Sequence, residues 1–230
     1  CSCASRTSTC RTRVRQVLVR LAQEQVVTVE LNKGATVAQP SIEDAREVFE
    51  ARAVVEAVLV RRFIERAQPA DFEALNDCIE AEEEARREGD QAAALRLSGR
   101  FHLMIAEVAG HQTFTRMLAM LISRTSLILM SYAPLERSIA GRSLAAQPPA
   151  RWVDACRCNA HRGVLAALRQ ARDGASLTSL LADAEHRMRE HLADIEAGLC
   201  FNLPEPTTAD MTELFSPRAV PRSASRLPVG

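Results

Sequence analysis

The sequence has no uninterrupted apolar run of 18 residues, and it shows no charged leader followed by an apolar stretch and a small-residue cleavage site. These absences argue against a membrane span and a secreted protein. We therefore expect a cytoplasmic protein with no membrane partner. Lysine is nearly absent as well, because Lys33 stands alone and arginine supplies every other basic side chain. We interpret the arginine excess as coding bias.

Paired cysteine motifs are also missing. The chain has seven cysteines, an odd number, and no two of them are spaced as C-x-x-C. This pattern supports neither a disulfide framework nor a zinc ribbon. We expect reduced thiols that pack as small apolar side chains. A redox or metal-binding element at Cys156 and Cys158 is the alternative.

Sequence motifs of catalysis are absent too. The chain has no glycine-rich phosphate loop, no nucleophile elbow and no acidic pair in a catalytic setting, so we expect that it is not an enzyme. The rival interpretation is a metal-dependent helical-bundle enzyme. A di-iron bundle uses Glu-x-x-His pairs on two helices, and the sequence lacks them.

What the sequence does have is an uneven distribution of charge. Residues 1–40 contain six basic and two acidic side chains, a net charge of +4, while the whole chain has a net charge of zero. The remaining residues therefore carry a net charge of −4. A basic first segment joined to an acidic remainder is typical of a polyanion-binding head on a body with another task.

A basic helix and a hairpin follow each other within these first residues. Apolar residues recur at helical spacing between residues 11 and 21, and arginines occupy the opposite face. Alternating apolar residues, among them Val27 and Val29, then precede the tight turn Asn32-Lys33-Gly34, which is typical of a two-stranded hairpin. This order predicts a partial winged helix-turn-helix domain over residues 1–40.

The same segment resembles the GntR family of bacterial transcription regulators. The resemblance is carried by Arg11, Thr12, Val14, Arg15, Leu18, Leu21, Glu24, Val27 and Gly34. Cys10 and Gln25 differ, since the family usually has Ser and Gly at these places. The resemblance implies two helices ahead of the basic helix, but residues 1–9 are too short and too polar to form them. We therefore expect a truncated DNA-binding unit whose apolar stripe lacks most of its partner surface.

In a winged helix the recognition helix enters the major groove and the wing contacts the DNA backbone or minor groove. The candidate DNA contacts are Arg11, Thr12, Arg15, Arg20, Lys33 and Gly34. Arg11 and Arg15 suit base edges or phosphates, because a guanidinium can grip either bidentately. Thr12 suits a phosphate, and Gly34 allows close approach of the wing. Arg20 suits the backbone or solvent. The alternative is an ordinary basic surface helix.

Residues 41–200 predict an all-α, antiparallel bundle of six to seven helices. Ser41 is a good N-cap, and the apolar period stays near 3.6 from there on. The expected helices run from Ser41 to about Gln68 and from about Phe72 to Gly89, and then cover 92–109, 113–130, 152–172 and 177–198. We interpret the acidic tract Glu80–Glu84 as a solvated helix face, residues 138–149 as a loop, and residues 201–230 as a disordered tail.

This helical body resembles the FCD effector domain of the FadR-type subgroup of GntR regulators over residues 42–198. The motifs that carry the resemblance are Arg52-x-x-x-Glu56, Phe101-His102, Ala160-His161 and Met188-x-x-His191. They occur in the family's order, downstream of the winged-helix match. The resemblance implies a sensor domain that binds a small molecule.

The resemblance also implies a site for Zn²⁺ or another divalent ion at His102, His161 and His191. Many such domains add an aspartate four residues before the first histidine, and here that position is Ser98. Losing this carboxylate removes an anionic ligand and lowers metal affinity, so both retention and loss of the metal stay open. The alternative is three core imidazoles bonded to neighbours. The other histidines, His111 and His186, are expected to be exposed or capping.

Arg52 and Arg124 are the candidate arginines for effector binding, together with the three histidines. Their guanidinium groups suit a small carboxylate metabolite held in a largely apolar cavity. For Arg52 the alternative is a salt bridge to Glu56, one helical turn away, and both can hold at once.

These observations together predict a homodimeric transcription regulator that binds a double-stranded DNA operator. A small organic acid in the helical domain would control operator affinity, and the two affinities would be linked reciprocally. The alternative from a different class is a ligand or metal sensor without competent DNA binding.

Overall fold

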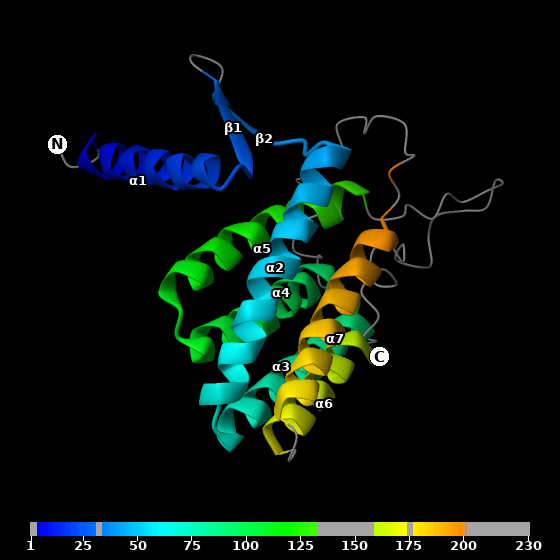
Figure 1. Ribbon diagram of the computed structural model, residues 1–230. Coiled ribbons are helices and arrows are strands. Elements are labelled where there is room, and N and C mark those ends of the chain that lie inside the picture. The colour runs from blue at the N-terminus through cyan, green and yellow to red at the C-terminus, as the bar shows by residue number, and fades with distance from the viewer. Residues whose placement is uncertain (1–3, 31–33, 133–158, 174–176, 200, 202–230) are drawn as a thin grey trace, which may run out of the picture.

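The computed structural model in Figure 1 describes residues 4–30, 34–132, 159–173, 177–199 and 201. In these residues it has seven helices and one hairpin. The elements are α1 (Ala4–Gln23), β1 (Val27–Glu30), β2 (Gly34–Val37), α2 (Ile42–Arg66), α3 (Pro69–Arg87), α4 (Gln91–Ala109), α5 (Gln112–Tyr132), α6 (Asn159–Asp173) and α7 (Leu177–Ala197). The prediction of an all-α bundle preceded by a hairpin is confirmed. The expected loop at 138–149, the start of a helix at Trp152, and nearly all of the expected tail lie outside the described residues.

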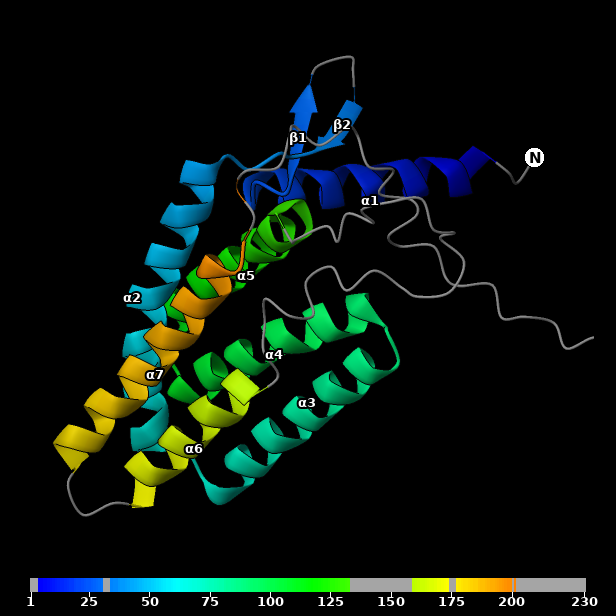
Figure 2. The same cartoon turned by 90° about the vertical axis from the view of Figure 1, so that its right-hand side faces the viewer.

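Helix α2 runs along the middle of the bundle. It packs against α4, α5, α6 and α7, while α3 packs against α4 and α6, and α6 packs against α7. Figure 2 shows α3, α4 and α6 together at one side of α2. Three helices that are distant in sequence, α4, α6 and α7, therefore all pack against α2.

Local signals set the helix ends. Ser41 caps α2 in a capping box, in which its hydroxyl accepts from the Asp44 backbone N–H and the Asp44 carboxylate accepts from the Ser41 N–H. Pro69 begins α3, where a missing N–H costs nothing. Gly110 ends α4 with a φ of 68°, a left-handed conformation that glycine adopts without strain.

The core consists of two apolar clusters with a polar layer where they meet. One cluster is built around Phe63, Phe101 and Met188, among others. The second includes Phe49 and Leu192. Along α7, His191 lies between Met188 of the first cluster and Leu192 of the second. Buried charged and histidine side chains thus lie at the centre of the bundle, where each needs a partner.

Helix α5 is the one described helix that is long and apolar enough, by length and composition, to cross a membrane. It packs against α2 and α4, and it places Leu118, Leu121 and Ile128 in the core. Its last residue, Tyr132, donates a hydrogen bond from its hydroxyl to the backbone oxygen of Pro40, at 2.5 Å. The C-terminal end of α5 is thereby joined to the segment that leads into α2.

The N-terminal part stands at one end of the bundle (Figure 1). Strand β1 pairs antiparallel with β2, with Val27 opposite Val37, which confirms the predicted hairpin. Val14 and Val17 of α1 are 52% and 57% exposed, as expected for a stripe short of partner surface. Gln25, where the GntR family usually has glycine, has a φ of 58°, the left-handed conformation that glycine adopts most easily.

Close packing of α4 on α5 depends on Gly99. A Cβ atom at this position would lie 2.8 Å from the Ile122 Cγ2 atom. We expect Gly99→Ala to lower the free energy of unfolding by about 1–3 kcal/mol, because the helices must separate or Ile122 must leave its rotamer. Urea unfolding followed by circular dichroism measures this change.

The matched control is Gly163→Ala in α6, where nothing lies within 4 Å of the added Cβ. This substitution should raise the free energy of unfolding by about 0.5–1 kcal/mol, through the better helix propensity of alanine alone. Equal stability of the two variants would contradict the close contact at Gly99.

Candidate metal centre

Three histidines from three helices meet in the polar layer. His102 lies on α4, His161 on α6 and His191 on α7, and each residue is at most 3% exposed. The Nε2 atom of His102 is 3.3 Å from the Nε2 atom of His161 and 3.3 Å from that of His191. Their ligand atoms all lie within 4.8 Å of one another. The structure thus brings together the three histidines singled out from the sequence.

Two buried glutamates orient two of these rings. The Nδ1 atom of His102 is 2.6 Å from a carboxylate oxygen of Glu56, and the Nδ1 atom of His161 is 2.7 Å from one of Glu82. Ionised carboxylates only accept hydrogen bonds, so both Nδ1 atoms donate. In a neutral imidazole this leaves Nε2 with a bare lone pair. A carboxylate behind a histidine is the usual means of presenting Nε2 to a metal ion.

The protonation states favour the same arrangement. Burial opposes ionisation of Glu56, but the charges of Arg52 and His102 more than offset it, so the pKa of Glu56 falls to about 2. Burial lowers the pKa of His102 to about 4, although Glu56 acts in the opposite direction. Burial, and then the nearby His161 and His102 rings, hold the pKa of His191 well below its usual value. His102 and His191 are therefore neutral near pH 7.

The geometry fits a divalent ion. Ligand nitrogens about 2.0–2.1 Å from Zn²⁺ at tetrahedral angles are about 3.4 Å apart, close to the spacing of the Nε2 atoms here. The Nε2 atoms of His102 and His161 face each other with bare lone pairs at this spacing, and a cation between them removes their repulsion. His102, His161 and His191 supply three ligand nitrogens, which leaves a further position for water or an anion.

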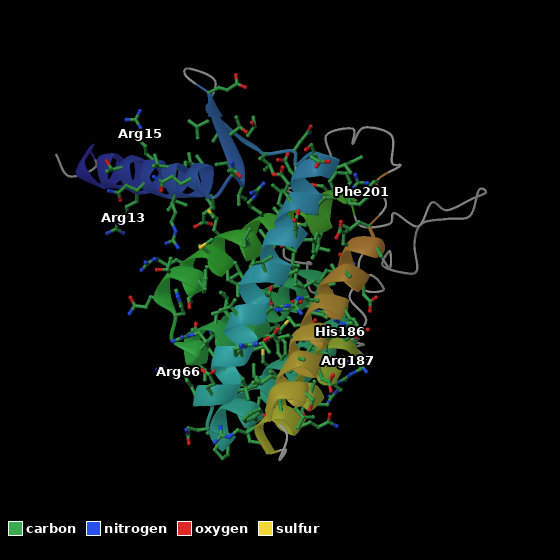
Figure 3. All side chains as sticks on the ribbon, in the orientation of Figure 1. Arg13, Arg15, Arg66, His186, Arg187 and Phe201 are labelled. Atoms are coloured by element: carbon green, nitrogen blue, oxygen red, sulfur yellow. The ribbon has the colours of Figure 1, made fainter. Side chains whose placement is uncertain are left out.

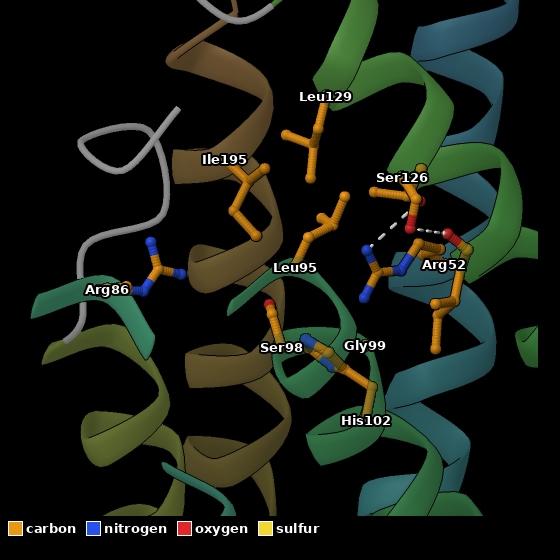
Figure 4. Close-up of a pocket in the computed structure, with 11 residues that line it drawn as sticks. Arg52, Arg86, Leu95, Ser98, Gly99, His102, Ser126, Leu129 and Ile195 are labelled. Carbon is orange, nitrogen blue, oxygen red and sulfur yellow. Dashed lines mark hydrogen bonds between the residues drawn. The ribbon is translucent and has the colours of Figure 1, made fainter. Parts of the chain in front are cut away.

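A cavity opens beside His102 (Figure 4). It is lined by Arg52, Arg86, Leu95, Ser98, Gly99, His102, Ile122, Thr125, Ser126, Leu129 and Ile195. Its free volume is about 20 Å³, room for about one water molecule. Apolar side chains, two arginines and three hydroxyls line it. Ser98, four residues before His102 on α4, is one of the lining residues.

Arg52 forms the expected salt bridge with Glu56 and also lines the cavity. Its Nε donates to Glu56 at 2.8 Å, and its Nη1 donates to the Thr125 hydroxyl at 3.4 Å. Its Nη2 is buried and has no hydrogen-bond partner among the described residues. A buried donor of this kind costs free energy unless a water or ligand satisfies it.

The structure does not bring Arg124 into this cavity. Its guanidinium lies 3.8 Å from the Asp44 carboxylate, at the N-terminal end of α2. The other two histidines lie where expected. His111 accepts from the Phe114 N–H at the start of α5, and His186 is exposed beside Glu190.

The interpretation of the acidic tract as a solvated face is wrong for Glu82. Its side chain is buried, accepts from His161 and pairs with Arg86. Burial raises the pKa of Glu82, but the His161 hydrogen bond and Arg86 outweigh this effect and lower it. The missed signal is the pair Glu82-x-x-x-Arg86 on α3. It has the spacing of Arg52-x-x-x-Glu56 with the acidic and basic residues in the opposite order, and it lies on a helix that packs against α6.

The candidate DNA contacts lie on α1 and the hairpin. Arg15 is exposed, and Figure 3 shows it on the opposite side of α1 from Arg13, an exposed arginine that the sequence analysis did not single out. Thr12 is exposed, and Arg20 is exposed beside Glu24. Gly34 begins β2 with a φ of 94°. Arg11 lies in α1, but its side chain and all of Lys33 are outside the described part of the structure.

Metal-free protein should lose stability as the pH falls. His102 has a pKa of about 4 in the fold against an ordinary value of 6.5, so the unfolded chain binds this proton first. The stabilisation is complete above pH 6.5 and is lost as the pH falls toward 4. At about 1.4 kcal/mol per pH unit, protonation of His102 alone should lower the free energy of unfolding by about 2 kcal/mol between pH 7 and pH 5.

His191 acts in the same direction, and Glu56 stays ionised throughout this window. The measurement is urea unfolding of EDTA-treated protein at a series of pH values. His186→Ala, which removes an exposed imidazole, should leave the slope unchanged. A stability that is flat between pH 7 and pH 5 would show that the buried imidazoles titrate normally.

Residues 47–194 match the FCD domain family. E. coli McbR/YncC has a similar structure, with a TM-score of 0.58 and 21% identity over 80% of this chain and 79% of that one. A protein from Rhodococcus sp. RHA1 described as a GntR transcriptional regulator has a TM-score of 0.57 and 20% identity over 81% and 78%. At these identities the likeness concerns the fold. No curated protein gives a significant match.

Proposed function

The chain belongs to the FCD-domain family of GntR-type transcription regulators. We propose that it is a cytoplasmic regulator whose helical domain controls operator binding. A small carboxylate bound in the helical domain would shift the affinity of the basic head for double-stranded DNA. The observation that carries the proposal is the buried cluster of His102, His161 and His191 beside a cavity that holds the Nη2 atom of Arg52.

In this proposal the three histidines hold a divalent ion such as Zn²⁺. The bound ion supplies a Lewis acid and positive charge at the edge of the cavity. Glu56 and Glu82 keep the His102 and His161 rings turned inward. The Arg52 guanidinium, fixed by Glu56 and Thr125, offers its Nη2 to a carboxylate oxygen.

The DNA-binding part is α1 with the hairpin as its wing. Arg11, Thr12 and Arg15 would contact bases or phosphates, Lys33 and Gly34 the backbone beside the wing, and Arg20 the backbone. The charge of this segment supports the assignment, since six basic and two acidic side chains occur in residues 1–40. Arg13, exposed on the other side of the helix, is a further candidate for phosphate contact.

A fluorescence-anisotropy titration with DNA from the gene's own promoter region tests this function. We expect binding that weakens steeply with salt, because phosphate contacts release counterions. Arg15→Ala should weaken binding at every salt concentration, whereas Arg187→Ala, an exposed arginine on α7, should not. Absence of salt-sensitive binding to any promoter fragment would overturn DNA regulation by this chain.

The exposed apolar stripe of α1 favours one other function. Val14 and Val17 are more than half-exposed, so α1 lacks the packing that usually holds a recognition helix in place. A helical sensor without competent DNA binding would then be the function of this chain. The same titration distinguishes the two, because the sensor would bind carboxylate and metal but no DNA.

Two copies of the chain would pair to read a pseudo-palindromic operator. Exposed apolar side chains on the neighbouring helices α2 and α5, namely Val54, Val58, Met117 and Met120, suit such a contact. We expect Val54→Asp to raise the dimer dissociation constant at least about 10-fold, because a charge replaces an apolar contact. Light scattering after size exclusion measures the mass.

The control is Val29→Asp, which changes another valine that is more than half-exposed, on the hairpin. Because both positions are exposed, both variants should retain the circular dichroism of the parent. If Val54→Asp and Val29→Asp dissociate at the same protein concentration, the face formed by α2 and α5 is not the dimer contact.

A further inference from the structure

Two buried arginines lie on opposite sides of the cavity. Arg52 comes from α2 and Arg86 from α3, and Ser98 of α4 lies between them (Figure 4). Each arginine pairs with a buried glutamate one turn away on its own helix, Glu56 or Glu82. These pairs fix both guanidinium groups at the cavity wall, within a bundle that gives them little freedom to move.

We infer that this cavity selects a small dicarboxylate over a monocarboxylate, and that it does so when the three histidines hold a divalent ion. This inference rests on the proposed function, in which the cavity is the effector site. It adds the charge of the effector, which the family resemblance does not specify, and it assigns the selection to Ser98 and to the two arginines.

The first argument is the charge of the site. The charges of Arg52 and Arg86 cancel those of Glu56 and Glu82, with which they pair. A bound divalent ion therefore leaves two uncompensated positive charges in a buried, low-dielectric place. An aspartate at position 98 would neutralise one of them, but this chain has Ser98. Two negative charges on the ligand would restore neutrality.

The second argument is an unsatisfied donor. The Nη2 atom of Arg52 is buried, lies at the cavity, and has no hydrogen-bond partner among the described residues. A carboxylate oxygen of the ligand would satisfy it with a charge-assisted hydrogen bond. The second carboxylate would then take the open position at the ion. A monocarboxylate can meet one of these demands but not both.

The third argument is the shape and lining of the cavity. Leu95, Ile122, Leu129 and Ile195 form an apolar wall that suits a short methylene chain. The hydroxyls of Thr125 and Ser126 also line the cavity, on the same face of α5 as Ile122 and Leu129. The free volume is about that of a water molecule, so a ligand must widen the cavity, and the shortest dicarboxylates, of three or four carbons, widen it least.

Isothermal titration calorimetry on the full chain tests the inference with length-matched acids. Malonate is compared with propionate and succinate with butyrate, on Zn²⁺-loaded and on EDTA-treated protein. We expect at least one dicarboxylate to bind the Zn²⁺-loaded chain at least about 10-fold more tightly than its matched monocarboxylate. On the EDTA-treated chain this preference should disappear, because without the ion the site has no net charge.

Ser98→Asp and Ser98→Asn separate charge from size, because their side chains have nearly the same shape. Ser98→Asp should cut the dicarboxylate preference to about threefold or less and should tighten Zn²⁺ binding. Ser98→Asn should keep the preference. If Ser98→Asp fails to fold, the dicarboxylate preference of the Zn²⁺-loaded parent, compared with that of the EDTA-treated parent, still tests the inference.

Each remaining outcome has one meaning. Equal binding of matched mono- and dicarboxylates, or a preference that survives metal removal, overturns the inference while leaving a carboxylate-controlled regulator intact. Failure of every acid to bind overturns both the inference and the proposed effector class. Loss of the preference in Ser98→Asn as well as in Ser98→Asp would show that bulk, not charge, excludes the ligand.

Discussion

Replacement of His191 with alanine is expected to lower the affinity for Zn²⁺ at least about 100-fold, because it removes one of three ligands. His191 is the most informative of the three histidines to change. Its Nδ1 has no hydrogen-bond partner among the described residues, so the substitution leaves no carboxylate without its donor. Changing His102 or His161 would instead remove the imidazole donor from the buried carboxylate of Glu56 or Glu82.

Competition with a chromogenic chelator measures this affinity, and the Zn²⁺-induced rise in melting temperature gives a second readout. The matched control is His186→Ala, an exposed histidine on the same helix, α7. It should bind Zn²⁺ as the parent does. If His191→Ala retains parental affinity, the three histidines are core imidazoles and no metal centre exists at this place.

Replacement of Glu56 with alanine should lower the free energy of unfolding by about 3–5 kcal/mol. Glu56 is buried and accepts from both Arg52 and His102, at 2.8 and 2.6 Å. Without it, the Arg52 charge stays in the core without a counter-ion and the His102 Nδ1 loses its acceptor. The expected loss is a large part of the stability of an ordinary domain. Urea unfolding of EDTA-treated protein measures it.

Glu50→Ala is the control, because Glu50 lies on the same helix and is exposed. Its effect should stay within about 0.5 kcal/mol. Glu56→Gln gives a second test, since its amide N–H₂ can donate to the His102 Nδ1. The ring would then carry its proton on Nε2, and Zn²⁺ affinity should fall about 10–100-fold. Equal stability of Glu56→Ala and Glu50→Ala would contradict the buried network.

The sequence predicted those parts of the fold that local interactions determine. Ser41 with Asp44 and the glycine at position 110 mark helix ends through hydrogen bonds and backbone conformations within a few residues. The hairpin likewise follows from alternating residues around a tight turn. Helix α1 is longer than expected and begins at Ala4, ahead of the apolar period that was used to recognise it.

The site was predictable only in part. The three histidines stood out because they matched a family pattern in order, and Arg52 did so with Glu56. Glu82 was not predictable in this way, because it lies within five consecutive residues that contain four acids. Its burial depends on where α6 packs against α3, which is a tertiary contact that no local pattern encodes. The same holds for Arg86.

The hydrogen bond between Tyr132 and Pro40 has a mechanical consequence. Thr125, Ser126 and Leu129 form part of the cavity lining, and they belong to the same helix as Tyr132. An α-helix is stiff, and the seven residue steps from Thr125 to Tyr132 span about 10 Å. Helix α5 thus runs from the cavity lining to the segment that joins the hairpin to α2. We expect a ligand that displaces the middle of α5 to shift that segment as well, and with it the position of the hairpin.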